Sequence, residues 1–144
     1  MTYPDNGPEK VIERSHAAWG EFVKGDPEPA KALFSRRDDV SLGNPFGPFV
    51  RGWKQAEQTM EKAASVFRDG EVSGFEAVST YISGDIACIV EVERYSAKVG
   101  GADRAPVALR VTSVLRREDE GWKIVHRHAD PITSARPAES VIQA

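Results

Sequence analysis

Residues 105–130 carry the pattern that most constrains the fold, because apolar and polar side chains alternate there along two successive segments. A period of two that is rich in β-branched residues is typical of a strand with one apolar face. The apolar face of the first segment consists of Val107, Leu109, Val111, Ser113 and Leu115. Residues 117–121 then form a turn, because Gly121 can adopt a positive φ, and residues 122–128 return as a second strand. The sequence therefore predicts an antiparallel hairpin against which the rest of the chain packs.

The composition is that of one globular domain with its own core. The chain has 144 residues, of which 40% are hydrophobic and 28% charged. A net charge of −3 argues against nucleic acid and against anionic membranes as partners. The single cysteine, Cys88, excludes an intrachain disulfide and is expected to be a buried, reduced thiol. No segment has the pattern of a signal peptide or a membrane span, so the expected location is the cytoplasm.

Three helices are expected in the first half of the chain. An apolar stripe predicts a helix over residues 9–24 that ends at Gly25. A short second helix is expected next, with Asp26 as its N-cap and Pro27 as its first residue. A third helix is expected over residues 52–67. The stripes of the two long helices contain Val11, Ile12, Ala18, Trp19, Phe22 and Val23, and Trp53, Ala56, Met60, Ala63 or Ala64, and Phe67.

Strand patterns dominate the second half. Residues 72–82 and 85–97 are expected to form two further long strands, and residues 40–42 a short one before a loop rich in proline and glycine. Helices first and strands afterwards predict an α+β fold, with three helices packed on one face of a strongly curved, mainly antiparallel sheet. Such a sheet encloses a cone with an internal pocket. A single domain spans residues 9–130, between a flexible arm (1–8) and a mobile tail (131–144).

Three motifs are similar to those of a known family. They are the turn at Gly25-Asp26, the loop Asn44-Pro45-Phe46-Gly47 with Gly52-Trp53 after it, and the closing run Gly121-Trp122-Lys123-Ile124-Val125-His126-Arg127-His128. Over residues 9–130 the chain resembles the nuclear-transport-factor-2-like superfamily, in its SnoaL-like and ketosteroid-isomerase-like branch. The resemblance implies the cone fold. It does not imply one activity, because this fold hosts isomerases, cyclases, dehydratases, epoxide hydrolases and non-catalytic association domains.

The resemblance to the isomerases places their catalytic roles on altered residues. Their proton-transferring carboxylate precedes Pro-Phe-Gly, where this chain has Asn44. Their helix-one tyrosine falls on Ala18, beside Trp19, and their protonated acid falls on or near Ser113. The isomerase mechanism is therefore expected to be absent.

The closing strand also looks like that of the kinase association domains of the superfamily. Their cone holds arginines that bind small carboxylates, and those positions fall on Glu91, Ser113 and Ala129. Arg127 is the nearest basic residue expected to face the cone. This second resemblance supports the fold and assembly rather than that ligand.

His16, Asn44 and Glu91 are the candidate catalytic residues. His16 lies on the apolar stripe of the first helix, as a core histidine or a catalytic one. Glu91 interrupts a buried strand, where pairing with Arg127 or Arg110 is favoured over work as a general base. Asn44 either positions a carbonyl or a water, or makes the turn before Pro45. The candidate ligand-binding residues are Trp19, Phe46, Trp53, Ser113 and Arg127, and Trp19 and Trp53 are expected to border one cavity.

His126 and His128 lie two residues apart on a strand, on the side that Trp122 and Ile124 are expected to share. A His-x-His pair can bind a metal, but a site needs a third ligand. Packing or an interface is therefore the favoured role, and neither a metal nor a cofactor is expected.

Two functions remain open from the sequence. One is a small-molecule-binding domain that acts by acid–base chemistry, without a cofactor, as an isomerase, cyclase or dehydratase on a small apolar substrate. The other is a non-catalytic binding or association module with a structural cavity. Convergence of His16, Asn44, Glu91 and Ser113 would favour the enzyme. Aromatic filling of the cavity by Trp19, Trp53 and Phe46 would favour the module. The expected partners are a small organic ligand and a second copy, in a homodimer through the outer sheet face. An apolar patch formed by Thr112, Val114, Trp122 and Ile124 motivates that dimer.

Overall fold

A computed structural model describes residues 7–143, which form three α-helices, six strands and one short 3₁₀-helix. The elements are, in chain order, α1 (Pro8–Phe22), α2 (Glu28–Lys31), β1 (Ser41–Gly43), β2 (Val50–Arg51), α3 (Trp53–Ala64), β3 (Phe67–Ser83), β4 (Ile86–Val99), β5 (Ala105–Glu118), β6 (Gly121–Asp130) and η1 (Ala138–Val141).

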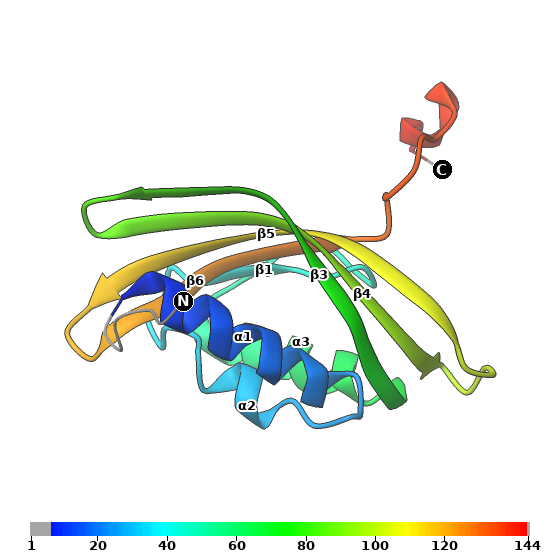
Figure 1. Ribbon diagram of the computed structural model, residues 1–144, viewed down its shortest axis with the longest axis horizontal. Helices are drawn as coiled ribbons and strands as arrows, with labels where there is room; N and C mark the ends of the chain where they lie inside the picture. The colour runs from blue at the N-terminus through cyan, green and yellow to red at the C-terminus, as the bar shows by residue number, and fades with distance from the viewer. Residues whose placement is uncertain (1–6, 144) are drawn as a thin grey trace.

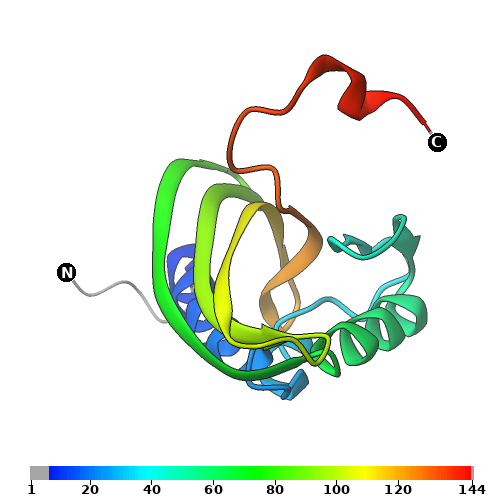
Figure 2. The same ribbon diagram turned by 90° about the vertical axis from the view of Figure 1, so that its right-hand side faces the viewer.

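The helices lie together on the concave face of one curved sheet, as Figure 1 shows. Seen from its end, the sheet wraps around α1 and α2, and α3 closes the opposite side next to β1 and β2 (Figure 2). The expected α+β architecture is therefore confirmed. The space between the helices and the concave face is the cone that positions the candidate site.

The six strands form one sheet in the order β2-β1-β6-β5-β4-β3. The long strands β3 to β6 pair antiparallel with their sequence neighbours. The short strand β1 was expected, but it pairs parallel with β6 and antiparallel with the additional strand β2. These pairings attach the loop at residues 44–49 to the sheet edge, so that it lies over one end of the cone.

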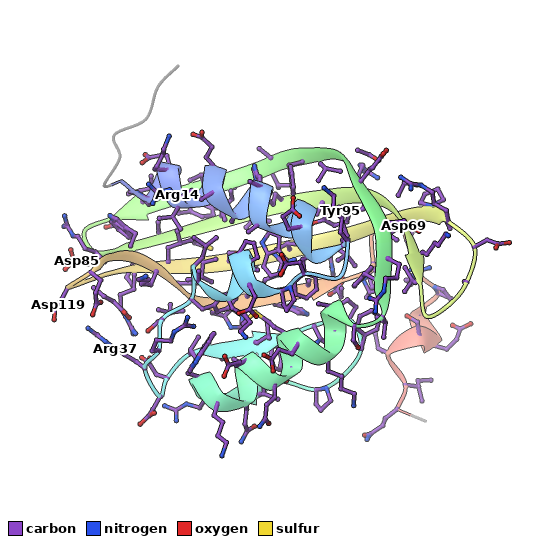
Figure 3. All side chains as sticks on the ribbon, turned by 90° about the horizontal axis from the view of Figure 1, so that it is seen from below. Arg14, Arg37, Asp69, Asp85, Tyr95 and Asp119 are labelled. Carbon is purple, nitrogen blue, oxygen red and sulfur yellow. The ribbon has the colours of Figure 1, made fainter. Side chains whose placement is uncertain are left out.

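The β5–β6 hairpin forms as predicted. Glu118 pairs with Gly121, so the connection has two residues, and Gly121 has a φ of 114° that only glycine adopts readily. In β5, Leu109, Val111 and Leu115 are buried on the concave face, as the alternation indicates. Figure 3 shows this turn, labelled at Asp119, at the same end of the sheet as the β3–β4 turn at Asp85.

The ends of the helices differ from the expected ones by a few residues. Helix α1 begins at Pro8, inside the range predicted as an arm, and Gly25 follows its end with a φ of 103°. Helix α3 ends at Ala64, because Phe67 already pairs with Val99 as the first residue of β3. Residues 1–6 of the predicted arm lie outside the described residues. The tail after Asp130 is exposed and contains η1, and its mobility stays a prediction.

One predicted side-chain orientation on β6 is wrong. Val114 pairs with His126 and Leu115 with Ile124, so Val125 is an extra residue in a β-bulge. A bulge of one residue shifts the alternation to the other face. Trp122 and Ile124 are therefore buried in the core, opposite to the outer face on which the pattern placed them, and they do not share a face with His126 and His128, which lie on the convex side as expected.

The expectation of a buried thiol is also wrong. Cys88 is only half-buried, because it alternates with the buried residues Ala87 and Ile89 and so faces the convex side of β4. None of the helices within residues 7–143 combines the length and the apolar character that crossing a membrane requires.

Candidate functional site

An internal cavity lies between the C-terminal part of α1, helix α3 and the concave face of the sheet. Its volume is about 40 Å³, above the roughly 10 to 15 Å³ that a single water needs. Most of its lining is aromatic or aliphatic. The lining residues are Trp19, Phe22, Val23, Leu42, Asn44, Pro45, Phe46, Met60, Ala63, Phe67, Glu93, Tyr95, Leu109, Arg127 and Ala129.

A closed polar network forms the floor of this cavity. The Arg127 guanidinium donates Nη1–H and Nη2–H bonds of 2.8 Å to the two oxygens of Glu93. The Tyr95 hydroxyl donates to Glu93 Oε1. The Arg127 guanidinium carbon also lies 3.7 Å from the centroid of a Trp19 ring, in cation–π geometry. Figure 3 labels Tyr95 on β4, above α1.

Burial controls the electrostatics of this network. Glu93 is 0% exposed and Arg127 5% exposed, so neither charge is hydrated. Burial would lower the pKa of Arg127, but the charge and hydrogen bonds of Glu93 outweigh burial and hold that pKa above its ordinary value. Burial, and next the charge of Glu93, raise the pKa of the Tyr95 hydroxyl. The network is therefore a bound ion pair with a neutral tyrosine.

The mouth of the cavity is formed by the loop between β1 and β2. Asn44 Oδ1 accepts a 2.9 Å hydrogen bond from the backbone N–H of Phe46, the geometry of an Asx turn. Phe46 is 54% exposed, and its ring centroid is 6.0 Å from that of Phe67. Of the roles left open for Asn44, the structure shows that of turn former, at the edge of the cavity.

Trp53 and Ser113 do not line this cavity. The Trp53 ring is at the start of α3, where it packs against Phe34 and where the Arg36 guanidinium carbon is 3.7 Å from its centroid. The expectation that Trp19 and Trp53 border one cavity is therefore wrong, because α3 lines the cavity with Met60 and Ala63, further along the helix, rather than with its first residue. Ser113 is buried beneath α1, among Val11 and other apolar residues.

His16 and Glu91 form a pair away from the cavity. His16 Nε2 lies 2.9 Å and 3.1 Å from the two oxygens of Glu91. The His16 ring stacks on Phe75, with centroids 3.8 Å apart and planes 8° from parallel. Both residues face a groove between α1 and the strands β3 and β4, so they do not converge with Asn44 and Ser113.

The expected partner of Glu91 is wrong. Arg127 pairs with Glu93 instead, and Arg110 is on the convex face, where it donates a 2.6 Å bond to Asp130. Glu93 and Tyr95 were not predicted as site residues. A signal was present, because Glu91, Glu93 and Tyr95 continue the alternation of Ala87 and Ile89 on the buried face of β4. That alternation does not reveal which carboxylate meets the arginine.

The two histidines on β6 have partners on the convex face. His126 Nδ1 lies 2.7 Å from the Ser41 hydroxyl, and His128 Nε2 lies 3.4 Å from Asp130. Burial and then the nearby His128 lower the pKa of His126. Within residues 7–143, no three side chains of His, Cys, Asp or Glu are grouped in a way that could hold a metal.

Chemically, the cavity can hold an apolar molecule but offers no available base. Glu93 has both oxygens engaged, and Asn44 is a neutral amide. Trp19, Phe46 and other aromatic rings line the cavity, but Trp53, which the alternative of a binding module would also place there, does not.

Comparison with protein families supports this architecture. A family model described as a SnoaL-like domain matches residues 10–133. None of the curated proteins matches the chain.

Several solved structures share the fold at low sequence identity. A nuclear transport factor 2 (NTF2-like) superfamily protein from Salmonella enterica is 20% identical, with a TM-score of 0.72 over 92% of this chain and 99% of that one. A proposed calcium/calmodulin-dependent protein kinase type II association domain from Thiobacillus denitrificans is 22% identical, with a TM-score of 0.72 and the same coverages of 92% and 99%. A ketosteroid isomerase-like protein from Erwinia carotovora atroseptica is 18% identical, with a TM-score of 0.69 over 88% and 94%. At these identities the similarity shows the fold alone.

Proposed function

The chain belongs to the SnoaL-like domain family, and on that premise we propose that its cone binds a small, uncharged and mainly apolar organic molecule without transferring a proton. One observation carries this proposal. Every ionisable side chain that lines the cavity, among the described residues, belongs to the closed Arg127–Glu93–Tyr95 network. A carboxylate whose anion is held by three hydrogen bonds and a guanidinium charge is a weak base toward a ligand.

The same network favours an uncharged ligand. An anion would have to displace Glu93 from Arg127, which would leave a buried carboxylate without its partner. A cation would meet the guanidinium over Trp19. A neutral molecule pays neither cost, and it gains by burying apolar surface against aromatic rings.

The size of the cavity indicates a small ligand. A volume of about 40 Å³ is well below the roughly 300 Å³ of a pocket for a drug-sized molecule. Phe46 is the lining residue that can make more room, because its exposed ring sits on a loop that only short strands hold. Entry of the ligand past Phe46 is therefore part of the proposal.

NMR titration of the tryptophan indole N–H signals tests the proposal. Benzyl alcohol should shift the Trp19 signal in a saturable way and leave those of Trp53 and Trp122 in place. Benzoate, which has a similar shape and a negative charge, should shift none of them. Ala63→Leu fills the cavity from α3 and should abolish the effect of benzyl alcohol, whereas Ala17→Leu on the exposed side of α1 should not.

Two results would contradict the proposal. One is binding of benzoate as tight as that of benzyl alcohol. The other is saturation by benzyl alcohol without a change at Trp19, since that would place the ligand outside the cone.

A second candidate function, association with another copy, rests on the convex face of the sheet. Cys88, Val90, Val92 and Val114 are only half-buried there, and Tyr81 is 61% exposed beside them. This patch replaces the predicted one, because Trp122 and Ile124 face the core. We propose that it pairs with the same patch of a second copy to form a homodimer.

Light scattering at micromolar concentration tests the association. The unchanged protein should be a dimer, and Val90→Glu, between Cys88 and Val92 in the patch, should convert it to a monomer. Ser73→Glu, an exposed change on β3, is the control for added charge. A monomer at micromolar concentration for the unchanged protein would rule the dimer out.

A further inference from the structure

A groove separate from the cone runs between α1 and the β3–β4 edge of the sheet, where Figure 3 shows the helix beside these strands. Its volume is about 310 Å³, larger than that of the internal cavity. Apolar side chains form one part of its surface and carboxylates another. The lining residues are Glu9, Ile12, Glu13, His16, Phe75, Ala77, Thr80, Ile89 and Glu91.

The His16–Glu91 pair is held rigidly at the bottom of this groove. Glu91 is 4% exposed, and both of its oxygens lie within 3.1 Å of His16 Nε2. Stacking on Phe75 fixes the plane of the imidazole. Two contacts from different strands therefore determine where the ring points.

The other ring nitrogen is open. Among residues 7–143, His16 Nδ1 has no hydrogen-bond partner, and no buried side-chain nitrogen or oxygen lacks one. Nδ1 must therefore be in contact with solvent, and the His16 side chain is 30% exposed. When Nε2 carries the proton that Glu91 accepts, the lone pair of Nδ1 is available to a molecule in the groove.

This is the arrangement of a general base. A buried carboxylate fixes the tautomer of the imidazole and stabilises the imidazolium that forms when the opposite nitrogen accepts a proton. The Arg127–Glu93 pair cannot act in this way, because a guanidinium accepts no proton and three hydrogen bonds hold the fully buried Glu93 as the anion.

We propose that the groove is a catalytic site in which His16 removes a proton from an uncharged or cationic organic molecule with an apolar face. Glu91 is the positioning residue. Three carboxylates line the groove, those of Glu9 and Glu13 on α1 and that of Glu91 on β4. The Lys10 ammonium lies 3.6 Å from the Glu13 carboxylate but is not part of the groove lining. No lysine or arginine of the described chain lines the groove, so anionic substrates are disfavoured.

A simple carbon acid, 5-nitrobenzisoxazole, reports on such a base. Nδ1 takes the proton from C3, the C–H electron pair forms the nitrile, and the N–O bond breaks. The oxygen leaves with the electron pair of the N–O bond as a phenolate, and the imidazolium returns its proton to water. The flat, neutral probe matches the apolar surface formed by Ile12, Phe75 and Ile89, and its product is followed by absorbance.

The unchanged protein should convert the probe faster than the same concentration of free imidazole. His16→Gln, which can still hydrogen-bond to Glu91, should lower kcat/KM by about 100-fold or more, since a positioned base contributes about 10²- to 10⁴-fold.

Glu91→Gln separates positioning from structure. A neutral amide no longer fixes the tautomer, so kcat should fall by at least about tenfold while KM stays the same. Glu91→Asp should restore part of kcat. A change in KM alone would show that Glu91 only shapes the groove, and would overturn its assignment.

Ala77→Trp tests the location of the site. Ala77 is exposed on β3, so the larger ring should occlude the groove without disturbing the core and should abolish turnover. Ala17→Trp on the outer side of α1 is the matched control and should keep the full rate. The proposal is overturned if the unchanged protein is no faster than imidazole, if His16→Gln keeps its rate, or if Ala77→Trp does. Since none of these variants enters the cone, such a failure would leave the proposed ligand binding there unaffected.

Discussion

The floor of the cone and the α1–β3 groove each contain a carboxylate of β4 paired with a nitrogen base, yet the two pairs differ in what they can do. Glu93 meets a guanidinium and a hydroxyl that use both of its oxygens, and the whole group is buried. Glu91 meets a single imidazole whose second nitrogen stays open. Glu91 and Glu93 are only two residues apart on β4, yet Glu93 belongs to a closed network and Glu91 to a pair with an available base.

Burial explains this difference. A polar atom without a partner is costly in the interior, so a fully buried network must satisfy every member. In the groove beside α1, water can hydrogen-bond to the second nitrogen of His16. That nitrogen therefore needs no partner within the protein. Whether a carboxylate and its partner can accept a proton from a bound molecule therefore depends in this protein on how exposed the pair is.

The largest expected effect comes from breaking the closed network. Arg127→Met leaves the Glu93 carboxylate buried without a partner, which typically costs about 3 to 5 kcal/mol in the free energy of unfolding. Urea denaturation at pH 7 measures this cost. The double variant Arg127→Met with Glu93→Leu removes both charges and should recover most of the loss. Equal loss in the single and double variants would show that Arg127 contributes packing rather than charge balance.

Breaking the open pair should cost less. His16→Ala removes the partner of Glu91, and an unsatisfied buried acceptor costs about 1 to 3 kcal/mol. Because water reaches this groove, the loss should lie below that of Arg127→Met in the same denaturation assay. Arg14→Ala, on the exposed side of α1, should change stability by less than about 0.5 kcal/mol. A larger loss for His16→Ala than for Arg127→Met would reverse the comparison of the two regions.

At the mouth of the cone, Asn44→Ala should have a smaller effect. It removes the bond from the Phe46 N–H, worth about 1 kcal/mol. Hydrogen exchange of the Phe46 amide should become faster, while the amides of β4 keep their protection. Unchanged exchange at Phe46 would mean that the loop does not depend on this turn.

Protonation of His126, which lies outside both regions, should change stability only slightly. Burial and then His128 lower its pKa in the folded protein, so the unfolded chain binds the proton more readily. The contribution is full above about pH 6.5, the ordinary pKa, and is lost as the pH falls through the lower folded-state pKa. Since the ring is partly exposed, the change should stay within about 0.5 kcal/mol. His126→Gln should flatten the dependence of the unfolding midpoint on pH between 7 and 5, and a slope that survives it would have another source.

The smallest expected effect is on steroid isomerisation. Asn44→Asp gives the mouth of the cone a carboxylate, but Ser113 lies outside the cavity and Ala18 offers no hydroxyl. A missing oxyanion donor costs about 100- to 1000-fold in turnover. The unchanged protein should show no activity on a Δ5-3-ketosteroid, and Asn44→Asp at most a weak gain, by absorbance of the conjugated product. Efficient isomerisation by the unchanged protein would require a base, and His16 and Glu91 would be the first residues to replace.

Much of the fold was predictable, because its signals are local. The stripe on α1 and the alternation of β5 each depend on neighbours within a few residues, and the structure confirms them. Helix α2 also forms, but it begins at Glu28, so Pro27 rather than Asp26 is its N-cap. The loop from Asn44 to Phe46 was also predicted from its prolines and glycines, although its position at the mouth of the cone was not. The site was predicted only in part, since Trp19, Phe46 and Arg127 line the cavity while Trp53 and Ser113 do not.

The sequence by itself determined the class of fold, the order of its elements and the buried face of β4 and β5, because a period of two assigns a face wherever a strand is regular. Only the tertiary structure decided the faces of β6, since the single extra residue Val125 reverses the alternation that follows it. It also decided that Arg127 pairs with Glu93 and that His16 pairs with Glu91. Those partners meet across elements, so the register of the strands and the rotation of α1 select them, and neither is encoded in the spacing of residues along the chain.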